Sequence, residues 1–350
     1  MNQNRILITG GAGFIGSHLT EVLLGRGAAV TIIDDLSTGK WENLERFKGS
    51  PRLKVLIASA ADAALLEREV PRHHFVYHLA SSVGVKLIID RPIQTVQNIF
   101  QTTDAVLAAC SKYRRPVLIT STSEVYGRSE AIPFREDSDV VMGATSKRRW
   151  AYACAKALDE FLALAHFYET NLPVFIVRLF NTVGPRQTGR YGMVLPTLLE
   201  QAVAGKPMTV YGDGNQSRCF CSVHDVVEGL TRFLAAPDAS GTVINLGTQE
   251  EVSILGLAQR IKTLTGSQSE IVLVPYDEAY GPGFDDMRRR VPDVSRAAEL
   301  LQWSASRSLD EIIREMSAVL AEASQARKSR EAPSVEDVAA LRYAVQASAR

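Results

Sequence analysis

The feature that most constrains the fold is a glycine-rich turn between an apolar strand and a helix near the start of the chain. The strand is Arg5-Ile-Leu-Ile-Thr9, and the turn reads Gly10-Gly11-Ala12-Gly13-Phe14-Ile15-Gly16. Glycines let the backbone turn tightly and approach a pyrophosphate, and the first turn of the following helix supplies N–H groups. We expect that helix from Ser17 to about Arg26, with apolar residues on one face. The pattern predicts the first unit of a dinucleotide-binding sheet.

The second strand, Ala29-Val-Thr-Ile-Ile33, ends in Asp34. A carboxylate at this position can accept both hydroxyls of a ribose and repels a 2′-phosphate, so it favours NAD over NADP. The alternative interpretation is an ordinary turn followed by an exposed aspartate. The cofactor contacts that we expect from this half of the chain are Gly10, Gly13, Phe14, Ile15, Gly16, Asp34 and Leu79.

Strands and helices alternate as far as Val177. Further strands are expected at 53–58 and 75–80, with long helices at 93–112 and 152–170. This alternation predicts an α/β fold with a doubly wound parallel sheet, in which a ligand lies across the carboxyl ends of the strands.

The length of 350 residues exceeds one typical domain. We expect a Rossmann domain at 1–178 and a smaller substrate-binding lobe at 179–321, with some elements returning to the first domain. A charged linker and a terminal helix should follow at 322–350. The expected cap of that helix is Ser334, and its apolar stripe is Val335, Val338, Leu341 and Val345.

Composition and charge exclude several classes of function. The formal net charge is zero, which gives no electrostatic basis for binding nucleic acid or an anionic membrane. No apolar run approaches the roughly 20 residues that span a bilayer, and the start of the chain lacks a signal-peptide layout. The four cysteines lack disulfide-rich spacing, and the six histidines form no metal constellation. We therefore expect a cytoplasmic protein with reduced thiols and no metal.

A second constellation follows the apolar run Pro116–Thr120. The strand ends in Ser121-Thr122-Ser123-Glu124, and a helix with Tyr152 and Lys156 comes after a polar loop. The two side chains, at i and i+4, share one helix face. An ammonium beside a phenol lowers the phenol's pKa, which makes a base for an alcohol hydroxyl. Taken alone, the spacing also fits an ordinary amphipathic helix.

Together with Arg178-Leu-Phe-Asn-Thr-Val-Gly-Pro-Arg186, these motifs resemble the extended short-chain dehydrogenase/reductase family. More closely, they resemble its nucleotide-sugar epimerases, dehydratases and decarboxylases, from about residue 5 to residue 321. The resemblance implies a bound NAD that oxidises a sugar C4 hydroxyl and often returns the hydride. It assigns Tyr152 as base, Lys156 to the nicotinamide ribose and Thr122 to the reacting hydroxyl.

The resemblance also implies a set of substrate contacts and a mode of assembly. Asn181, Arg186 and Arg218 stand where family members hold the nucleotide diphosphate, and Asn98 resembles a structural or relay group. Two helices from each subunit, here 93–112 and 152–170, would form the bundle of a homodimer. One departure concerns adenine recognition: the family usually has Gly-Asp after the third strand, where this chain has Ala58-Ser59, with Asp62 further on.

Glu124 is the residue that separates the possible reactions. Family members that only epimerise commonly carry a small or hydroxyl residue there, whereas dehydratases and decarboxylases tend to carry Glu. The Thr122-Ser123-Glu124 run and Lys147-Arg-Arg-Trp150 are similar to UDP-glucuronate decarboxylases. We therefore predict decarboxylation of UDP-glucuronate to UDP-xylose or its 4-keto form, with Ser123 and Glu124 at the reacting sugar.

A substrate carboxylate needs a cation, ideally a forked guanidinium. We assign Arg290, the last arginine of Arg288-Arg-Arg-Val-Pro-Asp293; a solvated charge is the alternative interpretation. Two other functions stay open. One is a 4-epimerase acting on UDP-glucose or UDP-glucuronate. The other is a non-catalytic NAD-binding sensor, although such proteins typically lose the Tyr or the Lys, and both are present here.

Overall fold

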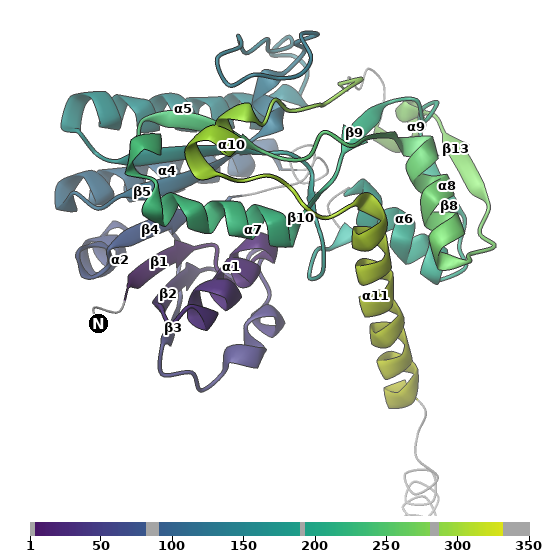
Figure 1. Ribbon diagram of the computed structural model, residues 1–350, viewed down its shortest axis with the longest axis horizontal. Helices are drawn as coiled ribbons and strands as arrows, with labels where there is room; N and C mark the ends of the chain where they lie inside the picture. Colours follow the sequence, from purple (N-terminus) through teal and green to yellow (C-terminus); the bar gives the residue numbers. More distant parts are fainter. Residues whose placement is uncertain (1–3, 82–90, 190–192, 281–286, 332–350) are drawn as a thin grey trace, which may run out of the picture.

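The computed structural model describes residues 4–81, 91–189, 193–280 and 287–331 (Figure 1). A seven-stranded sheet runs through its first lobe in the order β11-β6-β5-β4-β1-β2-β3. Its strands are β1 (Arg5–Thr9), β2 (Ala29–Asp34), β3 (Leu53–Ile57), β4 (Phe75–His78), β5 (Val117–Thr122), β6 (Val174–Leu179) and β11 (Thr242–Leu246). Every neighbouring pair is parallel. The predicted doubly wound sheet is therefore confirmed, and its strand order reverses between β1 and β4, where such folds bind ligands.

Helices cover both faces of this sheet (Figure 1). One face packs against α1 (Phe14–Gly25), α7 (Val223–Arg232) and α10 (Ser295–Leu301). The other packs against α2 (Ala63–Glu69), α4 (Pro92–Tyr113) and α5 (Trp150–Thr170). Because side chains alternate along a strand, Ile6 and Ile8 enter the first core while Leu7 enters the second. This burial on both faces explains why the strands read as continuous apolar runs.

The second lobe has its own core, built on α6 (Val194–Val203), α8 (Ile254–Thr265) and α11 (Leu309–Glu331). Three two-stranded sheets join it: β8 (Met208–Tyr211) with β13 (Ile271–Val274), β9 (Ser217–Cys219) with β12 (Glu251–Ser253), and β7 (Thr182–Val183) with β10 (Cys221–Ser222). The helix α9 (Tyr276–Tyr280) follows β13. In Figure 1 this lobe lies beside the carboxyl ends of the main sheet.

Short 3-10 helices lie in several of the connections between these elements. They are η1 (Trp41–Asn43), η2 (Glu45–Phe47), η3 (Val70–Arg72), η4 (Ser123–Tyr126), η6 (Phe233–Ala235) and η7 (Pro237–Ala239).

Two expectations about helices need correction. Helix α1 begins at Phe14 rather than at Ser17, because the glycine-rich turn already forms its first turn. Residues 322–331, expected as a linker, continue α11 to Glu331. Their Ala, Glu, Lys and Arg residues are strong helix formers despite their charge. The expected terminal helix, with Ser334 and its apolar stripe, lies outside the described residues.

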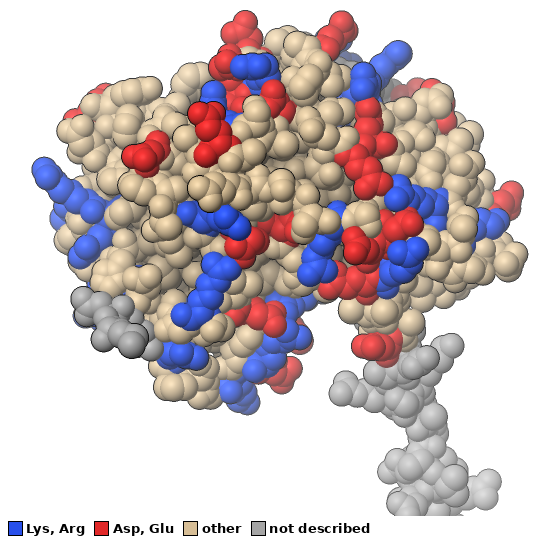
Figure 2. Space-filling view, in the orientation of Figure 1, with Lys and Arg blue, Asp and Glu red and all other residues tan. Residues whose placement is uncertain are grey.

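On the face drawn in Figure 2, acidic and basic side chains are interspersed, and neither kind forms a large patch of its own. Across the described ranges, no helix combines the length and the apolar character needed to cross a membrane. In the same part of the chain, no group of three or more His, Cys, Asp or Glu is placed to hold a metal ion.

Candidate active site

A cavity of about 580 Å³ lies between the two lobes, over the carboxyl ends of β1, β2, β4 and β5. Most of the side chains predicted from the sequence line it. They are Gly10, Gly13, Phe14, Ile15, Gly16, Asp34, Leu79, Asn98, Thr122, Ser123, Glu124, Tyr152, Asn181, Arg218 and Arg290. Two predicted residues, Lys156 and Arg186, are not part of its described lining.

The glycine-rich turn packs closely on itself and on the residues after β4. Gly10 has φ +76°, and a Cβ there would lie 2.6 Å from the backbone nitrogen of Ala80. A Cβ on Gly16 would overlap the carbonyl oxygen of Gly10. The N-cap of α1, Gly13, has no side-chain hydrogen bond, so no capping side chain covers the first amides of the helix. An N-terminus of this kind fits a pyrophosphate.

Asp34 lies at the end of β2, beside the glycine-rich turn, and lines the cavity. Its Oδ2 accepts from the Ala12 backbone N–H and its Oδ1 from the Leu36 N–H, both at 2.8 Å. Burial raises the pKa of Asp34, and these two hydrogen bonds oppose that rise. Each carboxylate oxygen can accept a further hydrogen bond. The side chain therefore fits the ribose hydroxyls of NAD.

The expected adenine side of the cavity is lined by Ser59, Ala60 and Ala61. Asp62, considered as a substitute for the family aspartate, instead caps α2, where its Oδ1 accepts from the Leu65 N–H at 3.0 Å. Short polar and apolar groups thus replace the usual carboxylate, as the departure in sequence suggested.

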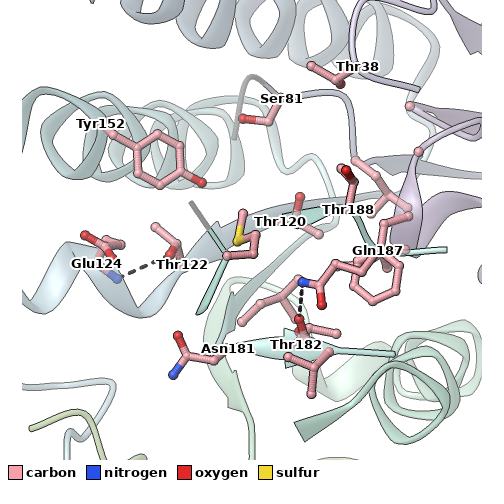
Figure 3. Close-up of a pocket in the computed structure, with 18 of the residues that line it drawn as sticks. Thr38, Ser81, Thr120, Thr122, Glu124, Tyr152, Asn181, Thr182, Gln187 and Thr188 are labelled. Atoms are coloured by element: carbon pink, nitrogen blue, oxygen red, sulfur yellow. Dashed lines mark hydrogen bonds between the residues drawn. The ribbon is translucent and has the colours of Figure 1, made fainter. Parts of the chain in front are cut away.

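Tyr152 and Thr122 reach into the same space from α5 and from the end of β5 (Figure 3). The backbone N–H of Glu124 donates to Thr122 Oγ1 at 3.3 Å, which fixes the threonine hydroxyl at this strand end. A hydrogen bond with Thr122 lowers the pKa of Tyr152. Burial, foremost, and the charges of Glu124 and Asp159 raise it, so that the net shift is upward.

The prediction that Lys156 lowers the pKa of Tyr152 towards neutrality is wrong for this structure. The Lys156 Nζ lies beneath the cavity and binds Asp159 Oδ2 at 2.8 Å. Because a carboxylate neutralises the ammonium, burial decides the pKa of the phenol. The signal for this pairing was present in the sequence, since Asp159 follows Lys156 by three residues on the same helix.

Glu124 is held by two arginines. Arg149 Nη1 lies 2.7 Å from Glu124 Oε2, and Arg149 Nη2 donates to Oε1 at 3.1 Å. Arg290 Nη1 pairs with the same Oε1. All three side chains are buried, and together they carry one positive charge in excess. Arg290 therefore lines the cavity beside Glu124, and so does Arg149, which the sequence analysis did not identify as a site residue. Arg149 could have been recognised from the sequence, because it precedes Tyr152 by about one helical turn.

Of the three predicted diphosphate contacts, two line the cavity and the third does not. Asn181 and Arg218 line the cavity; Asn181 Nδ2 donates to the Cys219 carbonyl at 3.0 Å. Arg186 instead binds Glu21 and, at 3.3 Å, Ser17 Oγ on α1, so its guanidinium tethers the loop after β7 to the first lobe. The missed residues of this wall lie on the second lobe and belong to no motif that we recognised. They are Gln187, Thr209, Tyr211, Gln216, Phe220 and Tyr276.

The fold and the cavity define a class of protein. A doubly wound sheet with a glycine-rich turn, and with a tyrosine and a threonine in the same cavity, is characteristic of extended short-chain dehydrogenases/reductases. Within that class, the chain belongs to the family whose model is described as GDP-mannose 4,6 dehydratase, which matches residues 7–316. The family resemblance predicted from the motifs is confirmed.

Similar proteins include decarboxylases and epimerases of nucleotide sugars. A UDP-N-acetyl-alpha-D-glucosaminuronate decarboxylase from Bacillus cytotoxicus is 42% identical over 316 residues, which cover 89% of this chain and 96% of the relative. A UDP-glucuronic acid decarboxylase 1 from Danio rerio is 34% identical, with 89% and 71% covered. The solved UDP-glucuronic acid 4-epimerase from Bacillus cereus, in complex with UDP-glucuronic acid and NAD, superposes with a TM-score of 0.82 at 28% identity, covering 91% and 99%.

Proposed function

We propose that the protein is an NAD-dependent decarboxylase of a UDP-linked hexuronate, with UDP-glucuronate as the first candidate substrate. The observation that carries this proposal is the Glu124–Arg149–Arg290 cluster, which brings a carboxylate and two guanidinium groups to the cavity that Tyr152 lines. Guanidinium groups bind carboxylates in a forked geometry that a neutral sugar does not need. The names of the two decarboxylase relatives support the same choice.

The turn of Gly10 to Gly16 would hold the pyrophosphate of NAD, and Asp34 its adenosine ribose. When bound, NAD supplies a hydride acceptor for the sugar C4. Of the chain's own groups, Tyr152 and Thr122 bind the C4 hydroxyl, and the Tyr152 oxygen takes its proton as C4 becomes a ketone. The same phenol gives the proton back when the ketone is reduced.

The C4 ketone lies β to the C6 carboxylate of a hexuronate. Cleavage of the C5–C6 bond releases carbon dioxide and leaves its electron pair as an enolate over O4, C4 and C5. Arg149 and Arg290 would orient the carboxylate before it leaves. Glu124, directly or through a water, would return a proton to C5. The products are the UDP-pentose or its 4-keto form, according to whether the hydride returns.

Mass spectrometry of the products tests this function. Purified protein is incubated with UDP-glucuronate, with UDP-N-acetylglucosaminuronate and with UDP-glucose, because the two relatives differ in the group at C2. We expect loss of carbon dioxide from at least one of the two uronates and none from UDP-glucose. Unchanged mass for both uronates would overturn decarboxylation.

The second candidate is 4-epimerisation, which the likeness to the UDP-glucuronic acid 4-epimerase favours. It would use Tyr152 in the same way, but the 4-keto sugar would rotate in the site, so that the hydride returns to the opposite face of C4. An epimer keeps the mass of its substrate, so the UDP-sugar recovered from the same incubation is also separated by chromatography and assigned by NMR to identify this reaction. No turnover of any UDP-sugar would favour an NAD-binding sensor.

We also propose a homodimer built on α4 and α5. These helices pack together over one face of the sheet and expose large apolar side chains on their outer faces. Ile93 is 75% exposed on α4, and Phe161 and Tyr168 are 66% and 72% exposed on α5. Large exposed apolar side chains on a packed helix pair support a protein interface there.

A cytoplasmic site of action fits the cysteines. All four are free thiols, and Cys110, Cys219 and Cys221 are buried. Unpaired thiols are usual in a reducing compartment.

A further inference from the structure

The loop after β7 carries an arginine where its backbone favours glycine. The Gln187 N–H donates to the Gly184 carbonyl at 3.3 Å and closes a four-residue turn. The two central residues are Pro185 and Arg186, and Arg186 has φ +68°. A turn with proline second and a positive φ third is of type II, and its third residue is usually Gly or Asn. Arginine is unfavourable there on backbone grounds, so its side-chain contacts must compensate.

The side chain of Arg186 is held on α1, the helix that follows the glycine-rich turn. Its Nη2 pairs with Glu21 Oε2, and its Nη1 donates to Ser17 Oγ at 3.3 Å. The preceding residue is held on the same helix, because the Pro185 carbonyl lies 2.9 Å from His18 Nε2. The Arg186 side chain is only 14% exposed, so its ion pair is partly shielded from water, unlike ordinary surface pairs. Helix α1 thus fixes the turn at two consecutive residues.

The other side of the same loop faces the cavity. Gln187 and Thr188 line it (Figure 3). The Gln187 Nε2 donates to the Thr182 carbonyl at 2.9 Å, while its Oε1 is buried and has no hydrogen-bond partner among the described residues. Buried acceptors usually have a partner, and a ligand in the cavity can supply one here. The direction of the Gln187 side chain follows from the turn, which Arg186 holds from outside the cavity.

We propose that Arg186 and Glu21 are positioning residues for the substrate: their ion pair holds the turn that carries Gln187, part of the cavity wall, in its binding position. Neither Arg186 nor Glu21 belongs to the described lining of the cavity. The identity of the substrate as a UDP-sugar rests on the proposed function, whereas the ion pair and the turn do not. A carboxylate on the helix beside the cofactor site thereby determines how tightly the substrate binds.

The affinity for UDP measures this role without requiring turnover. Isothermal titration calorimetry with NAD present gives the affinity and the number of binding sites separately. Arg186→Met and Glu21→Met should each weaken UDP binding by about tenfold with the number of sites unchanged, the scale for residues coupled through one ion pair. Arg46→Met is the matched control, because Arg46 binds the other oxygen of Glu21 and its side chain is 56% exposed. It should change the affinity by less than about twofold.

The combined variant separates a positioning role from direct contact with the ligand. If the two residues act through their ion pair, Arg186→Met together with Glu21→Met should bind UDP about as weakly as either single variant. A guanidinium that moved to the diphosphate instead would make Arg186→Met weak and leave Glu21→Met like the wild type. That result, or wild-type affinity in both single variants, would overturn the proposal.

Arg186→Asn guards against a variant that fails to fold. Asparagine suits a positive φ at the third position of this turn, so the change removes the guanidinium with little cost to the backbone. It should weaken UDP binding as Arg186→Met does. In turnover of UDP-glucuronate, the KM of the Arg186 and Glu21 variants should rise by about tenfold with kcat unchanged. A loss confined to kcat or to the number of sites would show a folding defect and would contradict the positioning role.

Hydrogen exchange of the backbone amides in the segment 184–189 tests the ion pair without any ligand. Exchange there should be faster in Arg186→Met and Glu21→Met than in the wild type and in Arg46→Met. If the wild type binds no UDP but exchange differs in this way, the proposed function fails while the holding of the turn by Arg186 and Glu21 stands. If the wild type binds UDP and exchange is the same in all four proteins, the inference about Arg186 and Glu21 fails alone.

Discussion

Glu124 is the residue on which the choice of reaction depends. Replacing it with Gln keeps the shape and removes the charge that Arg149 and Arg290 bind and the group that would protonate C5. We expect product formation to slow by roughly 100-fold or more, as for loss of a general acid–base group. NAD affinity, measured by fluorescence titration, should change little, because the glycine-rich turn and Asp34 are untouched. Equal turnover in Glu124→Gln would remove the main support for decarboxylation.

Arg290 and its neighbour Arg289 form a matched pair for testing carboxylate recognition. Arg290 is buried on Glu124, whereas Arg289 is half-exposed and pairs with Glu251. Arg290→Met should raise the KM for UDP-glucuronate by roughly 100-fold, the scale for truncating one partner of a buried charge pair. Arg289→Met should change it less than about fivefold, because exposed ion pairs contribute little. Similar losses in the two variants would show that Arg290 acts through folding rather than through the substrate.

The positions of residues in the cavity could be predicted where a motif fixes local geometry. Thr122 ends β5, Glu124 lies just after it, and Tyr152 lies in the first turn of α5; all three line the cavity. The partners of charged groups could not be predicted in this way. Arg186 pairs with Glu21, more than 160 positions away in the chain, and only the packed structure brings them together.

At the scale of the element, the junction of β1 and α1 offers a test with an internal control. Gly16 and Gly25 lie in the same helix, but a Cβ on Gly16 would overlap Gly10, while a Cβ on Gly25 would have no neighbour within 4 Å. Gly16→Ala should therefore weaken NAD binding and lower the melting temperature. Gly25→Ala should leave binding intact and stabilise the fold by up to about 1 kcal/mol. Equal NAD affinities in the two variants would contradict a role of this turn in binding the cofactor.

Elements of the first lobe could be predicted because each carries a strong local pattern. Strand β1 runs over the predicted residues, and α4 and α5 differ by one or two residues at their ends. The second lobe was harder, since its short strands pair with segments distant in sequence, such as β9 with β12. No local pattern encodes such pairings.

At the scale of the whole molecule, buried neutral histidines should make the fold sensitive to acid. The pKa of His78 is lowered from 6.5 to about 3 and that of His18 to about 4, in each case mainly by burial. Between the unfolded and folded pKa values, the unfolded chain binds protons that the folded protein excludes, so stability falls as the pH falls below about 6.5. Each histidine should account for about 1 kcal/mol of the loss between about pH 7 and about pH 5.5.

Denaturant unfolding at these two pH values measures that loss. His78→Asn should reduce it, although the variant also loses hydrogen bonds and starts from a lower stability. His18→Asn provides a second, independent site on α1. If neither variant changes the pH dependence, other groups govern the acid sensitivity.

The proposed assembly of two chains can be tested by placing a charge on the exposed face of α5. In the proposed homodimer, the outer faces of α4 and α5 meet their copies in a four-helix bundle, which buries Ile93, Phe161 and Tyr168. Phe161→Glu would place a charge in that apolar interface, where desolvation without a partner is costly. Light scattering should find the wild type as a dimer and Phe161→Glu as a folded monomer. Leu273→Glu is the control, because Leu273 is 53% exposed on β13 in the other lobe, and it should stay dimeric. A monomeric wild type, or a dimer that withstands Phe161→Glu, would show that these apolar faces serve another purpose.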